Sequence, residues 1–156
     1  MSEKAFQDYY ADDFSHCYGC GRLNHRGLQI KSYWDGEESV AKLIPNEQHT
    51  AIPGFVYGGL IASLIDCHGT GTAAAASYRK EGRDMDTEPT LRFVTASLNV
   101  DFLAPTPLGP ELEIRSKVIE VTQKKVITEA IVTVEGTACA KGRVVAVRMP
   151  ATMMKK

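Results

Sequence analysis

The sequence has no long apolar run and no excess of charge of either sign. Its apolar stretches fall far short of the roughly 20 residues that a membrane-spanning helix needs. Its 18 lysines and arginines against 19 aspartates and glutamates give a formal charge of −1, and no basic block could grip a phosphate backbone. We therefore expect neither a membrane nor a nucleic acid among its partners, and a small or medium-sized ligand instead.

Cysteine is scarce as well, with four residues, Cys17, Cys20, Cys67 and Cys139. Residues 1–13 are polar and acidic and lack the apolar core of a signal peptide, which predicts a cytoplasmic protein with free thiols. Only Cys17-Tyr-Gly-Cys20 has metal-binding spacing. Structural zinc sites usually need two such pairs and no second pair occurs, so we predict a tight turn and no metal. A metal-linked interaction domain built on Cys17 and Cys20 is the alternative.

What is present is the balance of an ordinary globular protein, with 44% hydrophobic and 24% charged residues in a chain of 156. A chain of this length should bury roughly 70% of its extended surface, which is enough for a core without disulfides. We expect a single domain over residues 1–156, in which 1–15 form an N-terminal extension with a short helix at about 4–15.

The predicted elements are two strands, one helix and four further strand segments. Strands are expected at 28–34, 39–44, 90–103, 111–121, 124–135 and 137–149, and the helix at about 58–79. The pairs Asp35-Gly36 and Glu135-Gly136 predict hairpin turns. Short connections require antiparallel neighbours, so the fold class is α+β, with one helix on one antiparallel sheet.

The segment 90–103 alternates in polarity and should present two different faces. One face is apolar and the other is polar: Val94, Ala96, Leu98, Val100 and Phe102 against Thr95, Ser97, Asn99 and Asp101.

The predicted helix also has two unlike faces. The bulky face should lie on the sheet: Leu60, Ile61, Leu64, Ile65 and His68. The opposite face is small and nearly uncharged: Gly59, Ala62, Ser63, Asp66, Gly69, Thr70 and Ala73. Small residues let another surface approach closely, so this face should meet a partner chain, a ligand or both. Its one carboxylate, Asp66, is either a functional group or the acceptor of a structural hydrogen bond.

Gly58 and Gly59 begin the helix, where backbone N–H groups are unpaired and the helix dipole is positive. Glycines let a carbonyl oxygen approach these groups, as in an oxyanion hole. Gly59 and Asp66 lie about 10.5 Å apart along the axis, whereas a nucleophile must come within about 3 Å of the carbonyl carbon. One helix can hardly offer both groups to one substrate, but two antiparallel helices can. The sequence thus predicts a homodimer, or a dimer of dimers, with sites between subunits.

Three segments carry motifs: Tyr57-Gly-Gly-Leu-Ile-Ala-Ser-Leu-Ile-Asp66, Cys17-Tyr-Gly-Cys20-Gly-Arg-Leu-Asn24-His-Arg-Gly27-Leu28 and Thr95-Ala-Ser-Leu-Asn-Val-Asp-Phe-Leu-Ala-Pro105. In this order they resemble the His-Gly-Gly-x6-Asp motif, the Cys-x-Gly-Cys-Gly…Asn-x-x-Gly-Leu opening and the Thr-Ala-x-Leu-x-Val-x-Tyr/Phe-x-x-Pro strand of hotdog-fold acyl-CoA thioesterases of the PaaI-like and thioesterase-superfamily-member type. The resemblance covers residues 16–149.

This resemblance implies a hotdog fold, in which a curved antiparallel sheet of about five to six strands wraps one long central helix. It also implies a thioester hydrolase that dimerises side by side, binds acyl-CoA at the interface and transfers the acyl group to water. No cofactor is needed, since coenzyme A belongs to the substrate. By position in the motifs, Asp66 would be the general base or nucleophile, the Gly59 N–H would polarise the carbonyl, and the Thr95 hydroxyl would position water or substrate.

Tyr57 stands where the family has histidine. A phenol can donate a hydrogen bond, but it is no base at neutral pH. Tyr57 is therefore a catalytic candidate if this position only orients the thioester. If the position shuttles protons, the chain is a slow enzyme or a non-catalytic acyl-CoA-binding or sensing module. A hotdog enoyl-CoA hydratase or dehydratase is a further alternative, although that chemistry usually pairs aspartate with histidine and His68 is expected in the core.

Other residues are candidates for binding substrate. Near the helix these are Gly58, Ser63, Thr70 and Asn24, although Asn24 could simply cap a turn and Thr70 could bond its own helix. Cations could anchor the phosphates of coenzyme A, above all Lys141 and Arg143, and further Arg148, Arg79, Lys80 and Arg83. His49, in the loop before the helix, is a possible substitute for the missing imidazole.

Overall fold

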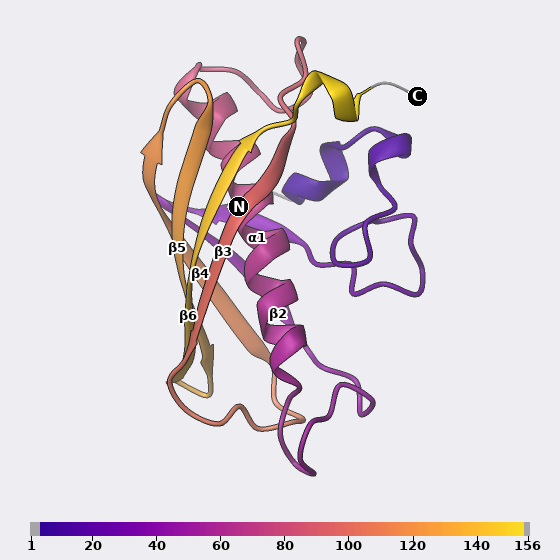
Figure 1. The fold of residues 1–156 in the computed structure, drawn as a ribbon, viewed down its shortest axis with the longest axis vertical. Coiled ribbons are helices and arrows are strands. Elements are labelled where there is room, and N and C mark those ends of the chain that lie inside the picture. The colour runs from indigo at the N-terminus through magenta and orange to yellow at the C-terminus, as the bar shows by residue number, and fades with distance from the viewer. Residues whose placement is uncertain (1–3, 155–156) are drawn as a thin grey trace.

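The computed structural model describes residues 4–154 as one curved sheet wrapped around one long helix (Figure 1). The helix α1 spans Gly58–Lys80, and the strands are β1 (Ser32–Asp35), β2 (Glu38–Leu43), β3 (Phe93–Phe102), β4 (Leu112–Val121), β5 (Lys125–Val134) and β6 (Thr137–Arg148). Short 3₁₀ turns lie near the ends of the described chain, η1 (Phe6–Tyr9), η2 (Asp12–Phe14) and η3 (Ala151–Met153). The expected α+β hotdog architecture is confirmed.

All six strands pair antiparallel in the order β1-β2-β4-β5-β6-β3, so β1 and β3 are the two edges of the sheet. Both predicted hairpins form, because glycine takes a left-handed backbone at Gly36 (φ 64°) and Gly136 (φ 82°). They make β1 a neighbour of β2 and β5 a neighbour of β6.

The first strand begins later than predicted, at Ser32 instead of residue 28. The N–H groups of Leu28 and Ile30 donate to the carbonyls of Tyr18 and Gly19 over 2.8 and 3.0 Å, so this stretch pairs with the preceding loop. The N-terminal segment is thereby tied together before the sheet begins.

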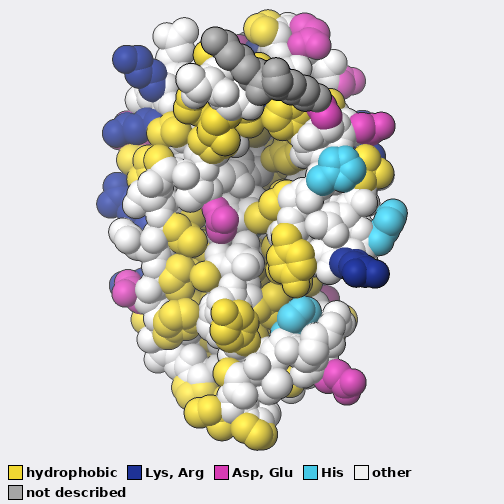
Figure 2. All heavy atoms as spheres, turned by 45° about the vertical axis from the view of Figure 1, so that its right-hand side comes forward, with side chains coloured by type: hydrophobic (Ala, Val, Ile, Leu, Met, Phe, Trp, Pro, Cys, Tyr) yellow, Lys and Arg dark blue, Asp and Glu magenta, His cyan; other side chains and the backbone are white. Residues whose placement is uncertain are grey.

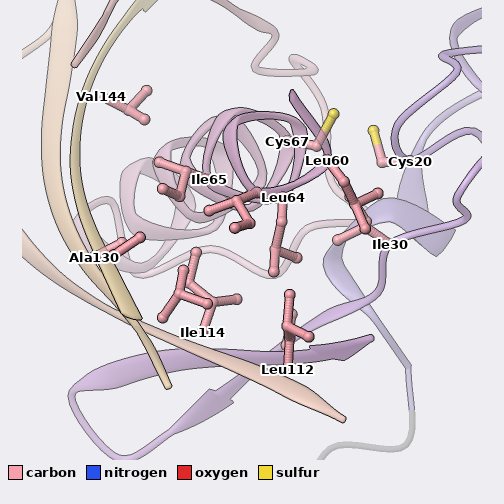
Figure 3. Close-up of a cluster of buried hydrophobic side chains, with 14 of the residues drawn as sticks. Cys20, Ile30, Leu60, Leu64, Ile65, Cys67, Leu112, Ile114, Ala130 and Val144 are labelled. Atoms are coloured by element: carbon pink, nitrogen blue, oxygen red, sulfur yellow. The ribbon is translucent and has the colours of Figure 1, made fainter. Parts of the chain in front are cut away.

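The bulky face of α1 packs on the inner face of the sheet, as the sequence predicts. Leu64 and Ile65 are fully buried, and Figure 3 shows both pointing toward the sheet, where Ile114 of β4 and Ala130 of β5 lie. Burial of each such large side chain stabilises the fold by about 1.5–3 kcal/mol.

Neither α1 nor another helix in residues 4–154 is long and apolar enough to cross a membrane.

Two residues predicted on the small face, Gly69 and Ala73, are buried instead. A Cβ added at Gly69 would lie 2.6 Å from Val144 Cγ2 of β6, so this glycine faces the sheet. The prediction is wrong here because the curved sheet covers more of the helix than a flat layer would. The half-exposed strip of α1 consists of Gly58, Gly59, Ala62, Ser63, Asp66 and Thr70.

The N-terminal extension forms two 3₁₀ turns instead of the expected short helix, and it lies against the second half of α1. Gln7 holds it in place, since its buried amide donates to Ser32 Oγ over 3.0 Å and accepts from Ser32 N over 2.8 Å. At Gly71, an added Cβ would lie 2.6 Å from Gln7 Nε2. A glycine in the helix thus makes room for this anchor.

A β-bulge in β3 changes which of its side chains share a face. The pairing with β6 shifts between Thr95 and Ser97, so that Thr95 lies opposite Ala146 and Leu98 lies opposite Val144. Ala146 and Val144 are both buried residues of the inner face. Thr95 and Leu98 therefore face the helix side together, whereas strict alternation predicts opposite faces. That prediction is wrong because the bulge inserts one extra residue into β3.

Candidate active site

Asp66 lies in the middle of α1 on its half-exposed strip, and β3 brings a hydroxyl group to it. Thr95 Oγ1 donates a hydrogen bond to Asp66 Oδ1 over 2.5 Å. The bulge in β3 turns Thr95 toward the helix and so makes this contact possible. Among residues 4–154, no other side-chain hydrogen bond reaches the carboxylate, which leaves Oδ2 available to a water or a substrate donor.

The first turn of α1 begins after Tyr57 without a capping side chain and holds no acidic residue. Its N–H groups are therefore positioned to meet an external acceptor. The Tyr57 ring folds over Gly59, since a Cβ added there would lie 2.3 Å from Cε2 and 2.6 Å from the hydroxyl oxygen. On the other side, a Cβ at Gly58 would lie 3.2 Å from Phe102 Cζ. The phenol hydroxyl thus lies beside the start of the helix, where the motif predicts a catalytic side chain.

These two parts of the predicted site lie about 10.5 Å apart along one helix. The edge strand and the loop that follows it add open apolar side chains beside α1: Leu98 is 36% exposed, Phe102 58% and Leu103 50%. Figure 2 shows a furrow on this side of the molecule with an acidic side chain in it and hydrophobic side chains along its borders.

A pocket of about 660 Å³ opens beside Asp66 and Thr95. Its remaining wall is largely aromatic and apolar, and comes from the N-terminal segment, α1, β3, the loop before β3 and the residue after β6: Tyr10, Phe14, Tyr78, Leu91, Phe93 and Met149. Small-molecule pockets range over about 300–1,000 Å³, so this one is large enough for a substantial ligand. The sequence does not reveal this pocket, because the N-terminal segment has no periodic pattern that predicts where it packs.

Three polar candidates near the helix bond to backbone. The hydroxyls of Ser63 and Thr70 donate to helix carbonyls three or four residues earlier, over 2.8 and 3.2 Å. Asn24 Nδ2 donates to His16 O over 3.1 Å, and its Oδ1 accepts from Arg26 N over 3.2 Å, so it caps a turn. Thr70 still lines the pocket. None of the three reaches the Asp66 carboxylate.

Lys141 and Arg143 lie on the outer face of β6, because the residues that alternate with them face the helix. They line a groove on that face with Asp101 and Glu129. The structure therefore does not bring them to Asp66 within one chain. The other candidate cations already bind neighbouring carbonyls or a carboxylate of the same chain: Arg79, Lys80, Arg83 and Arg148.

The histidines lie as the sequence suggests. His68 is buried, with Nδ1 2.8 Å from Ser32 Oγ and Nε2 3.0 Å from Ser39 Oγ. Burial lowers the pKa of His68 to about 3, so the ring is neutral and structural. His49 lies next to the start of α1, because its carbonyl accepts from Tyr57 N over 2.9 Å.

Cys67 of α1 joins Cys17 and Cys20 on the wall of the pocket. The three Sγ atoms lie within 4.8 Å of one another, which is close enough to hold a metal ion. Hydrogen bonds from Cys20 and Cys67 lower the pKa of Cys17, while hydrogen bonding to Cys17 raises the pKa of Cys67. Spacing in the sequence does not predict this cluster, because Cys67 is far from Cys17 and Cys20 along the chain and does not belong to a second CxxC motif.

Comparisons with known proteins identify the family. A family model of the thioesterase superfamily matches residues 53–141, which include α1, Asp66 and Thr95. Acyl-coenzyme A thioesterase THEM4 of Xenopus laevis is 40% identical over 76 residues, which are 49% of this chain and 28% of that protein. The match thus spans little more than a quarter of the length of this relative.

Solved structures add the fold and a closer relative. A thioesterase superfamily protein from Shewanella loihica PV-4 is 50% identical, with a TM-score of 0.68 over 90% of this chain and 100% of that one. The E. coli PaaI protein from the phenylacetic acid degradation operon is 18% identical, with a TM-score of 0.64 over 79% and 81% of the two chains, and shows the shared fold alone. On the family match and the Shewanella relative together, this chain belongs to the thioesterase superfamily.

Proposed function

We propose that the protein hydrolyses acyl-CoA thioesters at two equivalent sites of a homodimer. The observation that carries this proposal is the pairing of Asp66 with Thr95 beside a large apolar pocket. A carboxylate in that position can activate water, and the pocket can take an apolar acyl group. The relative named acyl-coenzyme A thioesterase supports coenzyme A as the acyl carrier.

In the proposed reaction, Asp66 accepts a proton from a water molecule as the water oxygen attacks the thioester carbonyl carbon, or it attacks that carbon itself. The carbonyl oxygen becomes negative and accepts a hydrogen bond from the N–H of Gly59 of the partner subunit. In the general-base route the C–S bond then breaks, the acyl group leaves as the free acid, and the coenzyme A sulfur takes up the proton. In the direct route the C–S bond breaks to leave an acyl–Asp66 anhydride and a coenzyme A thiolate. A water molecule then hydrolyses the anhydride, which releases the free acid, restores the Asp66 carboxylate and gives its proton to the thiolate. Thr95 holds the carboxylate, Tyr57 orients the thioester, and no cofactor takes part.

A second subunit is required because the two catalytic groups are too far apart on one helix. The apolar edge around β3 offers the surface for it. Leu98→Glu should give a monomer that no longer hydrolyses thioesters, as measured by sedimentation and thiol release. Ile119→Glu is the matched control, since Ile119 is 50% exposed on β4 and lies outside both the β3 edge and the outer groove. A Leu98→Glu monomer with full activity would refute the shared site.

Lys141 and Arg143 can contribute to coenzyme A binding only from the outer sheet face of another subunit, as a dimer of dimers would supply. We therefore propose that Lys141 and Arg143 bind the phosphates of coenzyme A only if the protein forms a dimer of dimers. The four unbridged thiols suit a reducing compartment such as the cytoplasm.

The decisive test is Asp66→Asn, which keeps the shape of the side chain and removes the base. Thiol release from a panel of acyl-CoAs should fall by about 100-fold or more. Glu37→Gln is the matched control, because Glu37 is an exposed carboxylate of the turn between β1 and β2 and lines neither the pocket beside Asp66 nor the outer groove. Unchanged thiol release in Asp66→Asn would overturn the proposal.

A non-catalytic acyl-CoA-binding module is the second candidate, and Tyr57 in place of the family histidine favours it. Saturable binding of acyl-CoA without thiol release would identify this function. Loss of the enoyl-CoA absorbance on incubation would instead identify a hydratase, for which the buried His68 offers no base.

A further inference from the structure

Three cysteines meet where the N-terminal segment touches α1. Cys17 and Cys20 come from one loop and Cys67 comes from the helix, and their sulfur atoms all lie within 4.8 Å of one another. The Cys17 and Cys67 sulfurs are 3.8 Å apart. Figure 3 shows Cys20 and Cys67 near each other and away from the sheet. The proposed hydrolysis uses none of these thiols.

The loop is shaped around these sulfur atoms. A Cβ added at Gly19 would lie 2.2 Å from Cys67 Sγ, so only glycine lets the loop close over the helix thiol. A Cβ at Gly21 would lie 2.5 Å from Cys17 N, and Gly21 N donates to Cys17 O over 2.8 Å, which closes a tight turn.

The distances suit a tetrahedral ion. With Zn–S bonds of about 2.3 Å, two sulfurs of a tetrahedral zinc site lie about 3.8 Å apart. The Cys17–Cys67 separation has this value, and Cys20 needs only a small movement to reach it. Thiolate ligands select soft or borderline ions such as Zn²⁺ over Mg²⁺ or Ca²⁺.

We propose that Cys17, Cys20 and Cys67 bind a zinc ion that fastens the N-terminal segment to α1. Each thiol releases its proton to solvent on binding, so three thiolates and Zn²⁺ carry a net charge of −1. The fourth ligand is water, since no other ligand group of residues 4–154 lies within the cluster.

The position of the site defines its role. The three cysteines line the same pocket as Asp66, and Cys67 directly follows Asp66 in the helix. The N-terminal segment supplies Tyr10 and Phe14 to that pocket, so an ion at its junction with α1 would hold the pocket wall in place. The role is architectural and independent of the hydrolysis step, so neither proposal depends on the other.

The test uses the full chain, reduced with a phosphine and stripped of metal with a chelator. Zn²⁺ affinity is measured by competition with a chromogenic chelator, and Co²⁺ reports thiolate ligands through its charge-transfer absorption. Wild type should bind one ion per chain and unfold at a higher temperature with zinc. Cys17→Ser, at an exposed position, should weaken binding by about 100-fold or more and lose the thermal shift. Cys139→Ser is the control, because Cys139 lies outside the cluster and should leave binding unchanged.

Three results would overturn the zinc site. The first is a wild-type protein without the cobalt charge-transfer band at one equivalent of metal. The second is a Cys139→Ser variant that binds as weakly as Cys17→Ser. The third is a reduced protein that takes up no metal but forms a disulfide between Cys17 and either neighbour in air, because the cluster would then be a redox pair.

Discussion

Gly59→Ala should separate activity from stability, because the three atoms nearest to the added methyl group all belong to the Tyr57 side chain. Its Cβ would lie 2.3 Å from Tyr57 Cε2 and 2.5 Å from Cζ, so the ring has to move. The side chain of Tyr57 is 57% exposed and can turn into solvent, so little folding energy is lost. Alanine also favours a helix by up to about 1 kcal/mol over glycine. The methyl group and the displaced ring would together crowd the N–H groups in the first turn of α1. Because the loss of one oxyanion donor lowers kcat by about 10²–10³-fold, we expect a fall of that size in kcat.

The assay compares thiol release from acyl-CoA with thermal unfolding. Gly69→Ala is the matched control on the same helix, since its Cβ would lie 2.6 Å from buried Val144 Cγ2. Overpacking of this kind costs about 1–3 kcal/mol, so Gly69→Ala should unfold earlier while its folded fraction keeps its kcat. Unchanged thiol release in Gly59→Ala, or destabilisation as large as in Gly69→Ala, would refute the reasoning.

Three further outcomes are expected. Thr95→Val should lower kcat by about 10–100-fold without changing the unfolding curve, because it removes a hydrogen bond to the Asp66 carboxylate; an unchanged kcat would leave Thr95 with a structural role. Burial keeps His68 neutral in the folded protein, with a pKa of about 3, whereas in the unfolded chain its pKa is about 6.5. Between these values only the unfolded chain binds the proton, so acid favours unfolding. The free energy of unfolding, measured in urea, should therefore fall by about 2 kcal/mol from about pH 7 to about pH 5. Replacing His68 with Gln should flatten that slope, and an equal slope would contradict the assignment. Leu64→Ala should lower the free energy of unfolding by about 2–5 kcal/mol in the same assay, since Leu64 is fully buried. A loss below about 1 kcal/mol would contradict this, because it would mean that neighbouring side chains fill the cavity.

Local chemistry was sufficient to predict most of the fold. The hairpins at Gly36 and Gly136 follow from turn residues that accept a left-handed backbone, and they fix antiparallel pairing on either side. The helix is found because Leu60, Ile61, Leu64 and Ile65 repeat with helical period, and because a basic last turn and a glycine mark its end. Asp66 is found for the same reason, since a lone carboxylate among small residues conflicts with a solvated helix face.

The remaining features depend on contacts between distant parts of the chain. The bulge that turns Thr95 toward Asp66 is a register shift against β6, and nothing in the alternation of β3 predicts it. To predict that Cys67 lies near Cys17, one must know where the N-terminal segment packs. That segment has no periodic pattern from which its packing could be predicted. The burial of Gly69 likewise follows from the curvature of the sheet.

The two edges of the sheet differ in length, with ten residues in β3 and four in β1. An open fibril of sheets would need a long free edge on both sides, because each added copy must offer one to the next. A copy that pairs along β3 occupies the long edge of both molecules and leaves only short ones. If the proposed dimer pairs along β3, growth by strand addition would stop at the pair, and the apolar border would be protected from aggregation.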